Sequence, residues 1–228
     1  MVAMEDMPFE KIKDQVRQDW GPVKPLAPPW KRGALLFGVW LILVALNLTL
    51  FGPRPDADVL GPWYFWVLPI IQLLSAYAVI VLGIRLTVPG SAAAPSVVTG
   101  LVFLGAAVHL AVSWIIFQIS PVEVEAGRHI QISLACLVFT LSLSILPLIL
   151  ALILSRRGMP SRPAVVGLAC GFACGLSAEA VWRMHCPYGS WSHVLSSHTA
   201  AVMAALLLGW ILSLVFFRHY GKRQSKPE

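Results

Sequence analysis

Six runs of apolar residues, each about 20 residues long or slightly longer, constrain the fold of this chain more than any other feature. They cover residues 33–51, 64–86, 99–118, 130–154, 164–184 and 194–217. A helix needs about 20 mostly apolar residues to cross the hydrocarbon core of a bilayer. A transmembrane barrel is excluded because its strands alternate apolar and polar residues, and these runs do not. We therefore expect an all-α integral membrane bundle of six transmembrane helices.

The segments between the runs are short, so the chain has no room for a soluble domain between its spans. Hydrophobic residues make up 57% of the 228 residues and charged residues 12%, whereas a soluble domain carries about 25% charged residues. We find no cleavable signal peptide before the first run, which we expect to be kept as an anchor. The predicted regions are a cytoplasmic arm over 1–32, a transmembrane domain over 33–217 and a basic cytoplasmic tail over 218–228.

Lysine and arginine residues predict the orientation of the bundle. If the N-terminus is cytoplasmic, the inner segments hold 14 of the 17 lysines and arginines, and the outer side holds Arg54, Arg128 and Arg183. Cytoplasmic segments of membrane proteins carry this excess of cations, so we expect both termini in the cytoplasm. The pI of 9.4 is then explained by charge at the membrane surface, and no direct contact with nucleic acid is expected.

The arm before the first run contains a predicted amphipathic helix. Four apolar residues recur at intervals of three or four residues and fall on one helical face: Phe9, Ile12, Val16 and Trp20. A proline-rich spacer, residues 22–30, follows and is expected to be extended. The helix can lie on lipid headgroups or bind a protein. Five acidic residues against six basic ones in the arm give anionic lipid little advantage, so a protein partner is at least as well supported.

The four cysteines fall into two pairs. Cys170 and Cys174 lie in the fifth run, where we expect them to be small packing residues at a close helix contact. Three glycines that recur every four residues indicate that contact: Gly167, Gly171 and Gly175. Cys136 lies early in the fourth run and Cys186 follows the fifth, so both are expected at the outer end of two neighbouring antiparallel helices. A disulfide, a shared soft metal ion and simple proximity are all consistent with this placement.

Polar residues inside the runs are few. Glu179 and Arg183 lie four residues apart near the outer end of the fifth run, and we expect them to form an ion pair with a structural role. Four further polar residues are scattered over other runs: Asn47, Gln72, His109 and Ser113. We expect these to form hydrogen bonds between helices rather than a relay, because no carboxylate is expected at their depth in the membrane.

Several residues that can bind metals lie near the outer thiols. They are four histidines and two glutamates: His129, His185, His193, His198, Glu123 and Glu125. Their spacing matches no known ligand signature, so we assign no metal site and no cofactor. The stretch Ser-Ser-His-Thr at 196–199 is similar to part of a membrane lipid phosphatase motif. The flanking motifs of those enzymes are absent, so we expect no enzymatic activity.

Five features distributed along the whole chain carry a family resemblance. They are the segment 22–32 before the first run, the Pro89-Gly90 turn, Cys136, the basic segment 154–163 and the sequence His185-Cys186-Pro187. In these features the chain resembles the NrsF-type negative regulators of sigma factors, a bacterial family of six-span inner-membrane proteins. The family usually continues His-Cys-Pro with two acidic residues, whereas Tyr188 and Gly189 follow here.

The resemblance implies an anti-sigma factor of the bacterial inner membrane that holds an extracytoplasmic-function sigma factor inactive and releases it under oxidant or heavy-metal stress. It implies that Cys136 and Cys186 respond to that stress at the periplasmic side, and His185 stands beside the second of them. The arm is then the expected sigma-factor-binding segment. Its expected contact residues are Phe9, Ile12, Val16, Trp20, Val23 and Leu26.

Two other classes of protein rank below this regulator. A small membrane transporter needs buried charges or broken helices near the middle of the membrane, and only Pro69 and Pro147 hint at such breaks. A membrane thiol oxidoreductase needs a Cys-x-x-Cys motif or a quinone site, and the sequence shows neither.

The distribution of cations gives a testable topology. A reporter enzyme fused after Glu228 or within residues 156–162 should behave as cytoplasmic, because both segments belong to the cation-rich side. The same reporter placed within residues 123–129 should behave as periplasmic. Paired fusions of a periplasm-active and a cytoplasm-active reporter at each position measure this. A periplasmic carboxy-terminus would contradict the count of six spans.

Overall fold

The structure is a computed structural model that describes residues 13–14, 26–88, 94–119, 122–156, 158, 160 and 162–224, with the backbone alone for residues 126 and 218–224. Every regular element in these residues is helical. In chain order the elements are α2 (Pro29–Phe51), α3 (Ala57–Arg85), α4 (Pro95–Ile119), the 3-10 turn η1 (Ala126–Arg128), α5 (His129–Arg156), α6 (Pro163–Arg183), the short α7 (Trp191–His193), the π-helical turn η2 (Val194–Thr199) and α8 (Ala200–Gln224).

Six of these helical segments are long and apolar enough to cross a membrane, which confirms the all-α prediction of six spans. All six begin before their apolar runs, and α2, α3 and α4 do so by four residues or more. The first helix begins at Pro29, because proline is well suited to the first turn of a helix, where its missing N–H costs nothing. The second begins at Ala57 and is broken at Gly61, whose φ of 69° lies in the left-handed region. Pro69 and Pro147, in contrast, lie inside helical backbone.

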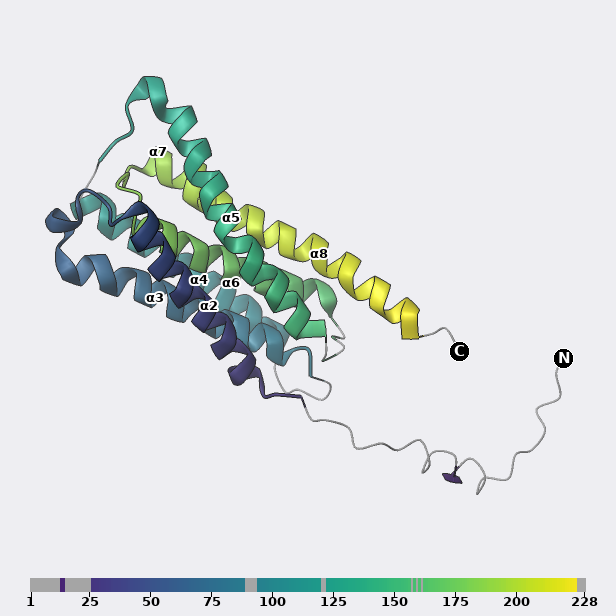
Figure 1. Ribbon diagram of the computed structural model, residues 1–228. Helices are drawn as coiled ribbons and strands as arrows, with labels where there is room; N and C mark the ends of the chain where they lie inside the picture. Colours follow the sequence, from purple (N-terminus) through teal and green to yellow (C-terminus); the bar gives the residue numbers. More distant parts are fainter. Residues whose placement is uncertain are drawn as a thin grey trace.

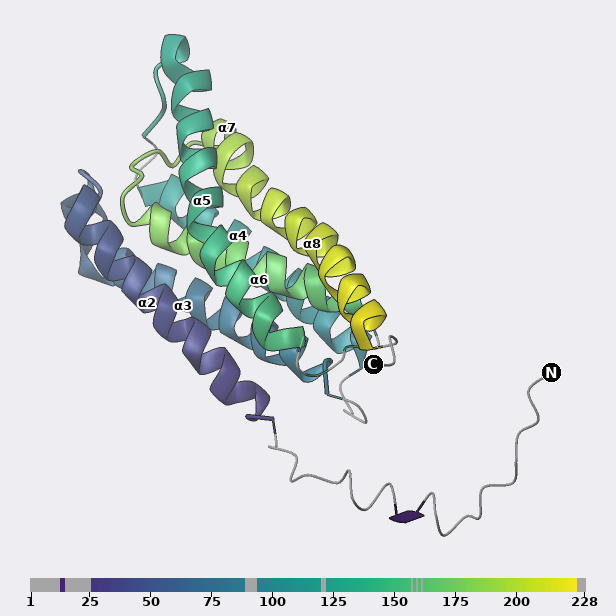
Figure 2. The same ribbon diagram turned by 45° about the vertical axis from the view of Figure 1, so that its right-hand side comes forward.

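The fifth span, α6, forms the centre of the bundle. Within its spanning window 83% of the residues are buried, against at most 50% in any other span. It packs most extensively against α8, then against α3 and α5, and it also contacts α2 and α4. Figure 1 shows α6 behind α2 and α5, and Figure 2 shows α2 and α8 on opposite sides of the bundle. The outer faces of the other helices carry exposed apolar side chains, as expected for helices that contact lipid.

Small residues let α6 and α8 approach closely. A methyl group added at Gly209 of α8 would lie 2.6 Å from the Cα atom of Gly171, and one at Gly175 would lie 3.0 Å from the Cα atom of Val202. These distances are shorter than nearly all real Cβ contacts, so the two backbones touch directly. The close helix contact predicted from the glycine pattern is therefore confirmed. Cys170 and Cys174 lie fully buried in the same core, which confirms their predicted packing position.

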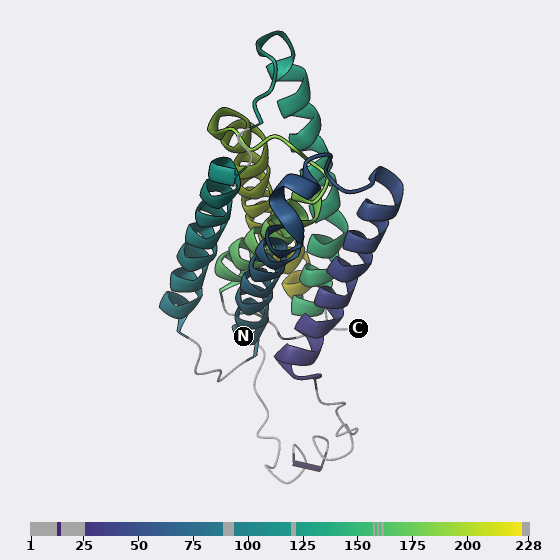
Figure 3. The same cartoon turned by 90° about the vertical axis from the view of Figure 1, so that its left-hand side faces the viewer.

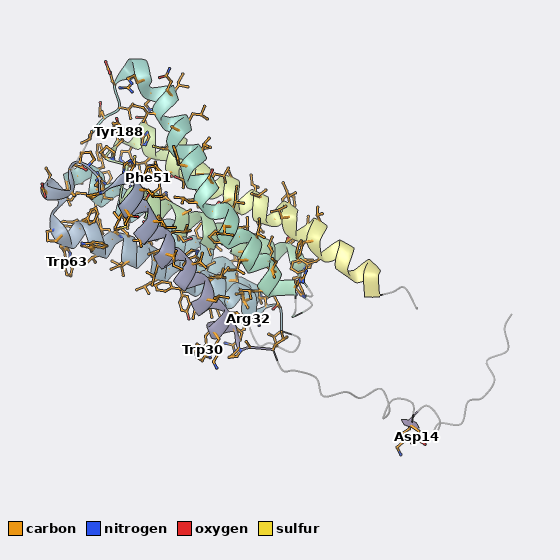
Figure 4. The ribbon with its side chains drawn as sticks, viewed as in Figure 1. Asp14, Trp30, Arg32, Phe51, Trp63 and Tyr188 are labelled. Atoms are coloured by element: carbon orange, nitrogen blue, oxygen red, sulfur yellow. The ribbon has the colours of Figure 1, made fainter. Side chains whose placement is uncertain are left out.

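The two ends of the bundle carry different segments. The thiol end is formed by residues 52–56, 122–128 and 184–190, which connect α2 to α3, α4 to α5 and α6 to α7. The arm end holds the start of α2 and the ends of α3 and α5. Figure 4 shows Trp30 and Arg32 at the arm end and Phe51 and Tyr188 at the thiol end, and Figure 3 shows the connections gathered at the thiol end.

The start of α2 is tied to two neighbouring helices. Arg32 is buried, and its Nη1 atom donates a hydrogen bond to the carbonyl oxygen of Leu154 at the end of α5, at 3.0 Å. The Tyr77 hydroxyl of α3 donates to the carbonyl oxygen of Trp30 at 3.3 Å. Leu26, just before the helix, is 41% exposed. Of the other residues predicted to bind a partner, Phe9, Ile12, Val16, Trp20 and Val23 lie outside the described residues.

Candidate functional site

Cys136 and Cys186 meet at the thiol end. Their sulfur atoms lie 3.7 Å apart, and all four cysteines of the chain are free thiols. Cys136 lies on α5 and Cys186 lies three residues after α6, so the antiparallel pair α5 and α6 brings the two thiols together as predicted. The hydrogen bond with Cys136, together with burial, raises the pKa of the Cys186 thiol well above its usual range. Cys186 therefore keeps its proton at neutral pH.

Aromatic rings cover the thiol pair. Cys136 and Cys186 form a small apolar cluster with Trp182 of α6. The Trp182 ring stacks on Phe139 of α5, with ring centroids 4.7 Å apart and planes 8° apart. Phe51, the last residue of α2, meets the edge of the same ring at 5.4 Å. The first span therefore contacts the surroundings of the thiols through one aromatic side chain.

Hydrogen bonds fix the segment that carries Cys186. The guanidinium of Arg54 forms an ion pair with Asp56 and donates to the carbonyl oxygen of Pro187 at 2.8 Å. The N–H of Gly189 donates to the carbonyl oxygen of Val122 at 3.1 Å. This segment is therefore held by both of the neighbouring connections, and the position of Cys186 depends on them.

Two histidines join the thiols. Cys136, Cys186, His193 and His198 are all buried, and the potential ligand atoms that they offer lie within 4.8 Å of one another. His193 Nε2 lies 3.4 Å from the Cys186 sulfur. The rings of His193 and His198 lie 5.3 Å apart, because the π-helical turn places residues five apart one above the other. We name these four side chains the four-donor cluster.

The other residues considered as ligands lie elsewhere. The Nδ1 atom of His185 lies 3.2 Å from the carbonyl oxygen of Gly52, and its ring contacts Phe51 and Trp182. Glu123 and Glu125 are exposed in the connection before α5. His129 begins α5, seven residues before Cys136. Sequence reasoning assigned no metal ligands, because the spacing of these residues matches no known ligand signature. An i, i+5 pair of histidines falls on different faces of a regular α-helix.

A second polar cluster lies deeper in the bundle, around Glu179. This carboxylate is fully buried on α6 and forms an ion pair with Arg183 one turn further along the helix. It accepts a hydrogen bond from the Gln72 amide of α3, and one of its oxygens lies 3.5 Å from His109 Nδ1 of α4. Its other oxygen lies 3.6 Å from His198 Nδ1. Side chains from four elements therefore face one carboxylate.

The structure confirms part of what was predicted for these polar residues. Glu179 and Arg183 form the expected ion pair, but Arg183 is only 3% exposed and donates to the Ser113 hydroxyl of α4 at 3.0 Å instead of extending to the membrane surface. The prediction that no carboxylate shares the depth of Gln72 and His109 was wrong. It failed because the depth of a residue depends on how far each helix is shifted along its neighbours, which sequence periodicity does not define.

The fold and these two clusters define a multi-pass membrane protein that holds thiols at one end of its helix bundle and the start of its first span at the other. The chain belongs to the NrsF family, because the family model described as "Negative regulator of sigma F" matches residues 17–219. It is similar to a protein of Caulobacter vibrioides (strain NA1000 / CB15N) named "Anti-sigma-F factor NrsF", with 29% identity over 218 residues. That match covers 90% of this chain and 99% of the relative. No solved structure matches the chain.

The buried carboxylate gives a prediction for stability. Glu179→Gln should destabilise the bundle by about 3–5 kcal/mol, because the buried Arg183 guanidinium loses its counter-charge. Unfolding of the purified protein in detergent, followed by circular dichroism against heat or a denaturing detergent, measures the change.

Two variants control this experiment. The double variant Glu179→Gln/Arg183→Met should recover part of the loss, because it leaves no unpaired charge in the core. Glu123→Gln, which changes an exposed carboxylate, should unfold like the wild type. If Glu179→Gln also unfolds like the wild type, the carboxylate does not hold the helices together.

Proposed function

We propose that this protein is a membrane-bound anti-sigma factor of the bacterial inner membrane, with both termini in the cytoplasm. It sequesters an extracytoplasmic-function sigma factor and releases it when an oxidant or a heavy metal reacts at the periplasmic side. Membership of the NrsF family supports the anti-sigma activity. The 3.7 Å approach of the Cys136 and Cys186 sulfur atoms is the observation that supports sensing at the thiol end.

The outer thiols are the sensing residues in this proposal. Two adjacent thiols can form a disulfide or share a thiophilic metal, and each reaction changes the packing around them. His185, directly before Cys186, contacts Trp182, which covers the thiol pair, so it positions this segment. The fully buried Cys170 and Cys174 lie in the glycine-lined core and have no such part.

The arm is the proposed binding site for the sigma factor. Its apolar stripe and the following spacer supply the contacts, and the partner is a cytoplasmic protein rather than nucleic acid. The proposed contact residues are Phe9, Ile12, Val16, Trp20, Val23 and Leu26. The side chain of Leu26, three residues before the start of α2, is 41% exposed, which is consistent with this role.

Helix α5 provides a physical link between the two ends. It carries Cys136 near its start and Leu154 near its end, 18 residues later, which corresponds to about 27 Å of helix. The carbonyl oxygen of Leu154 accepts the hydrogen bond from Arg32, where the arm enters the bundle. A shift of α5 after a reaction at Cys136 would therefore move the anchor of the arm. Such a shift regulates binding when the two positions of α5 differ in affinity for the sigma factor.

The apolar stripe of the arm can be tested by adding charge. Ile12→Asp together with Val16→Asp should cost about 2 kcal/mol or more of binding energy at each residue, because the charges would be buried in the interface. Transcription from a promoter that depends on the sigma factor should then rise without stress, at a normal membrane level of the protein.

The matched control places the same two charges off the stripe. Gln15→Asp together with Gln18→Asp adds equal charge on other faces of the predicted helix, so transcription should stay low. Equal transcription in both double variants would contradict a role of the stripe in binding.

The outer thiols can be tested against the inner pair. Replacing Cys136 and Cys186 by serine should abolish the transcriptional response to an oxidant or to Cd²⁺, because serine cannot form a disulfide or bind a soft metal. Replacing Cys170 and Cys174 by alanine should leave the response within about twofold of the wild type, because these thiols are fully buried in the core and a reagent cannot reach them. A reporter gene measures the response, and an immunoblot of membranes measures the protein level. A normal response in the outer double variant would show that the sensor lies elsewhere.

A further inference from the structure

Two distances within the four-donor cluster match those between neighbouring ligands of a tetrahedral metal ion. Zinc binds thiolate sulfur at about 2.3 Å and imidazole nitrogen at about 2.0 Å, so neighbouring ligands of a tetrahedral ion lie about 3.3–3.8 Å apart. The Cys136 and Cys186 sulfur atoms are 3.7 Å apart, and the Cys186 sulfur is 3.4 Å from His193 Nε2. The potential ligand atoms of all four side chains lie within 4.8 Å of one another.

Each of the two histidines has one ring nitrogen that faces a polar group outside the cluster, which leaves the other nitrogen for a metal. The Ser133 hydroxyl of α5 lies 3.1 Å from His193 Nδ1, so Nε2, the nitrogen that faces Cys186, is the one available. His198 Nδ1 is buried and finds no hydrogen-bond partner within the described part of the chain, but it lies 3.6 Å from the Glu179 carboxylate. Metal-binding histidines commonly donate their second N–H to such a carboxylate, which orients the ring.

The charges favour a divalent ion. Burying an uncompensated charge is costly, and two thiolates with two neutral imidazoles balance a charge of plus two. Soft sulfur ligands in a tetrahedral set select zinc-like ions of the d¹⁰ type over magnesium or calcium, which prefer oxygen.

We propose that Cys136, Cys186, His193 and His198 bind one divalent d¹⁰ cation, Zn²⁺ or Cd²⁺, while both thiols are reduced, and that Glu179 orients His198. Binding releases one proton from each thiol, and no electron is transferred. The inference deepens the proposed sensing role and rests on it, because it states the chemistry of the signal and adds two histidine ligands to the two thiols.

The test uses the full-length protein purified in detergent and kept reduced by a phosphine. Co²⁺, which reports tetrahedral sulfur and nitrogen ligands by intense visible absorption, is titrated in and then displaced by Cd²⁺. We expect one Co²⁺ per chain. His193→Asn and His198→Asn should each raise the dissociation constant at least about tenfold, since even residues that only contact a ligand change affinity about 10–100-fold.

Matched controls and a measurement on the wild type complete the design. His129→Asn, and Cys170→Ala together with Cys174→Ala, should bind like the wild type, because these residues lie outside the four-donor cluster. If a histidine variant fails to fold, X-ray absorption at the cadmium edge of the wild type counts the ligands directly. Two sulfur and two nitrogen ligands would support the site. Binding through sulfur and oxygen alone, or no binding to the reduced protein, would overturn it.

The outcome is separable from that of the proposed function. Binding of metal in detergent is measured without a sigma factor, whereas retention of the sigma factor is measured by its copurification with the membrane protein. A chain that binds Cd²⁺ through four ligands but never retains a sigma factor contradicts the proposed function alone. A chain that retains the sigma factor but binds no metal contradicts the four-ligand site alone.

Discussion

Glu179 lies fully buried on the central helix, and a carboxylate in apolar surroundings costs several kcal/mol unless it is paired. Arg183 supplies the counter-charge, while Gln72, His109 and His198 bring polar atoms from α3, α4 and η2. The positions of three elements relative to α6 are therefore set by the need to satisfy one charge. Apolar packing alone specifies such positions weakly, because lipid solvates apolar side chains as well as a neighbouring helix does.

Glycine contacts on α6 complement this polar cluster. Gly171 lets the backbone of α8 approach closely, with Gly209 of α8 against it. Direct backbone contact leaves no flexible side chains to absorb a displacement, so α6 and α8 move together as one unit. The span with the smallest buried share is α2, at 17% of its spanning window. It can shift at lower cost, and it is the helix that leads directly into the arm.

The six spans were predictable because a long apolar run determines a membrane helix locally, whatever its neighbours are. The meeting of Cys136 and Cys186 followed from the short connection between two antiparallel helices.

Two features were not predictable. His193 and His198 come together through a π-helical turn, and the helical periodicity of 3.6 residues assigns them to different faces. The depth that Glu179 shares with His109 depends on the relative shift of separate helices, which is a tertiary property. The four apolar residues of the amphipathic stripe lie outside the described residues, so that part of the prediction stays a prediction.

The polarity of α6 also has a consequence for how the protein enters the membrane. This helix carries two charged residues, Glu179 and Arg183, within its last five positions. A charged side chain disfavours insertion of an isolated helix by about 2.5–3.5 kcal/mol at the centre of the helix, and by less near its end, where the side chain can reach the interface. The two charges compensate each other in the finished bundle, but Gln72, His109 and Ser113, which complete their contacts, lie on α3 and α4. These two helices are synthesised earlier, so their polar faces are already in place when α6 leaves the ribosome. Integration of the fifth span is therefore expected to be cooperative, because the earlier helices supply polar contacts that lipid cannot supply.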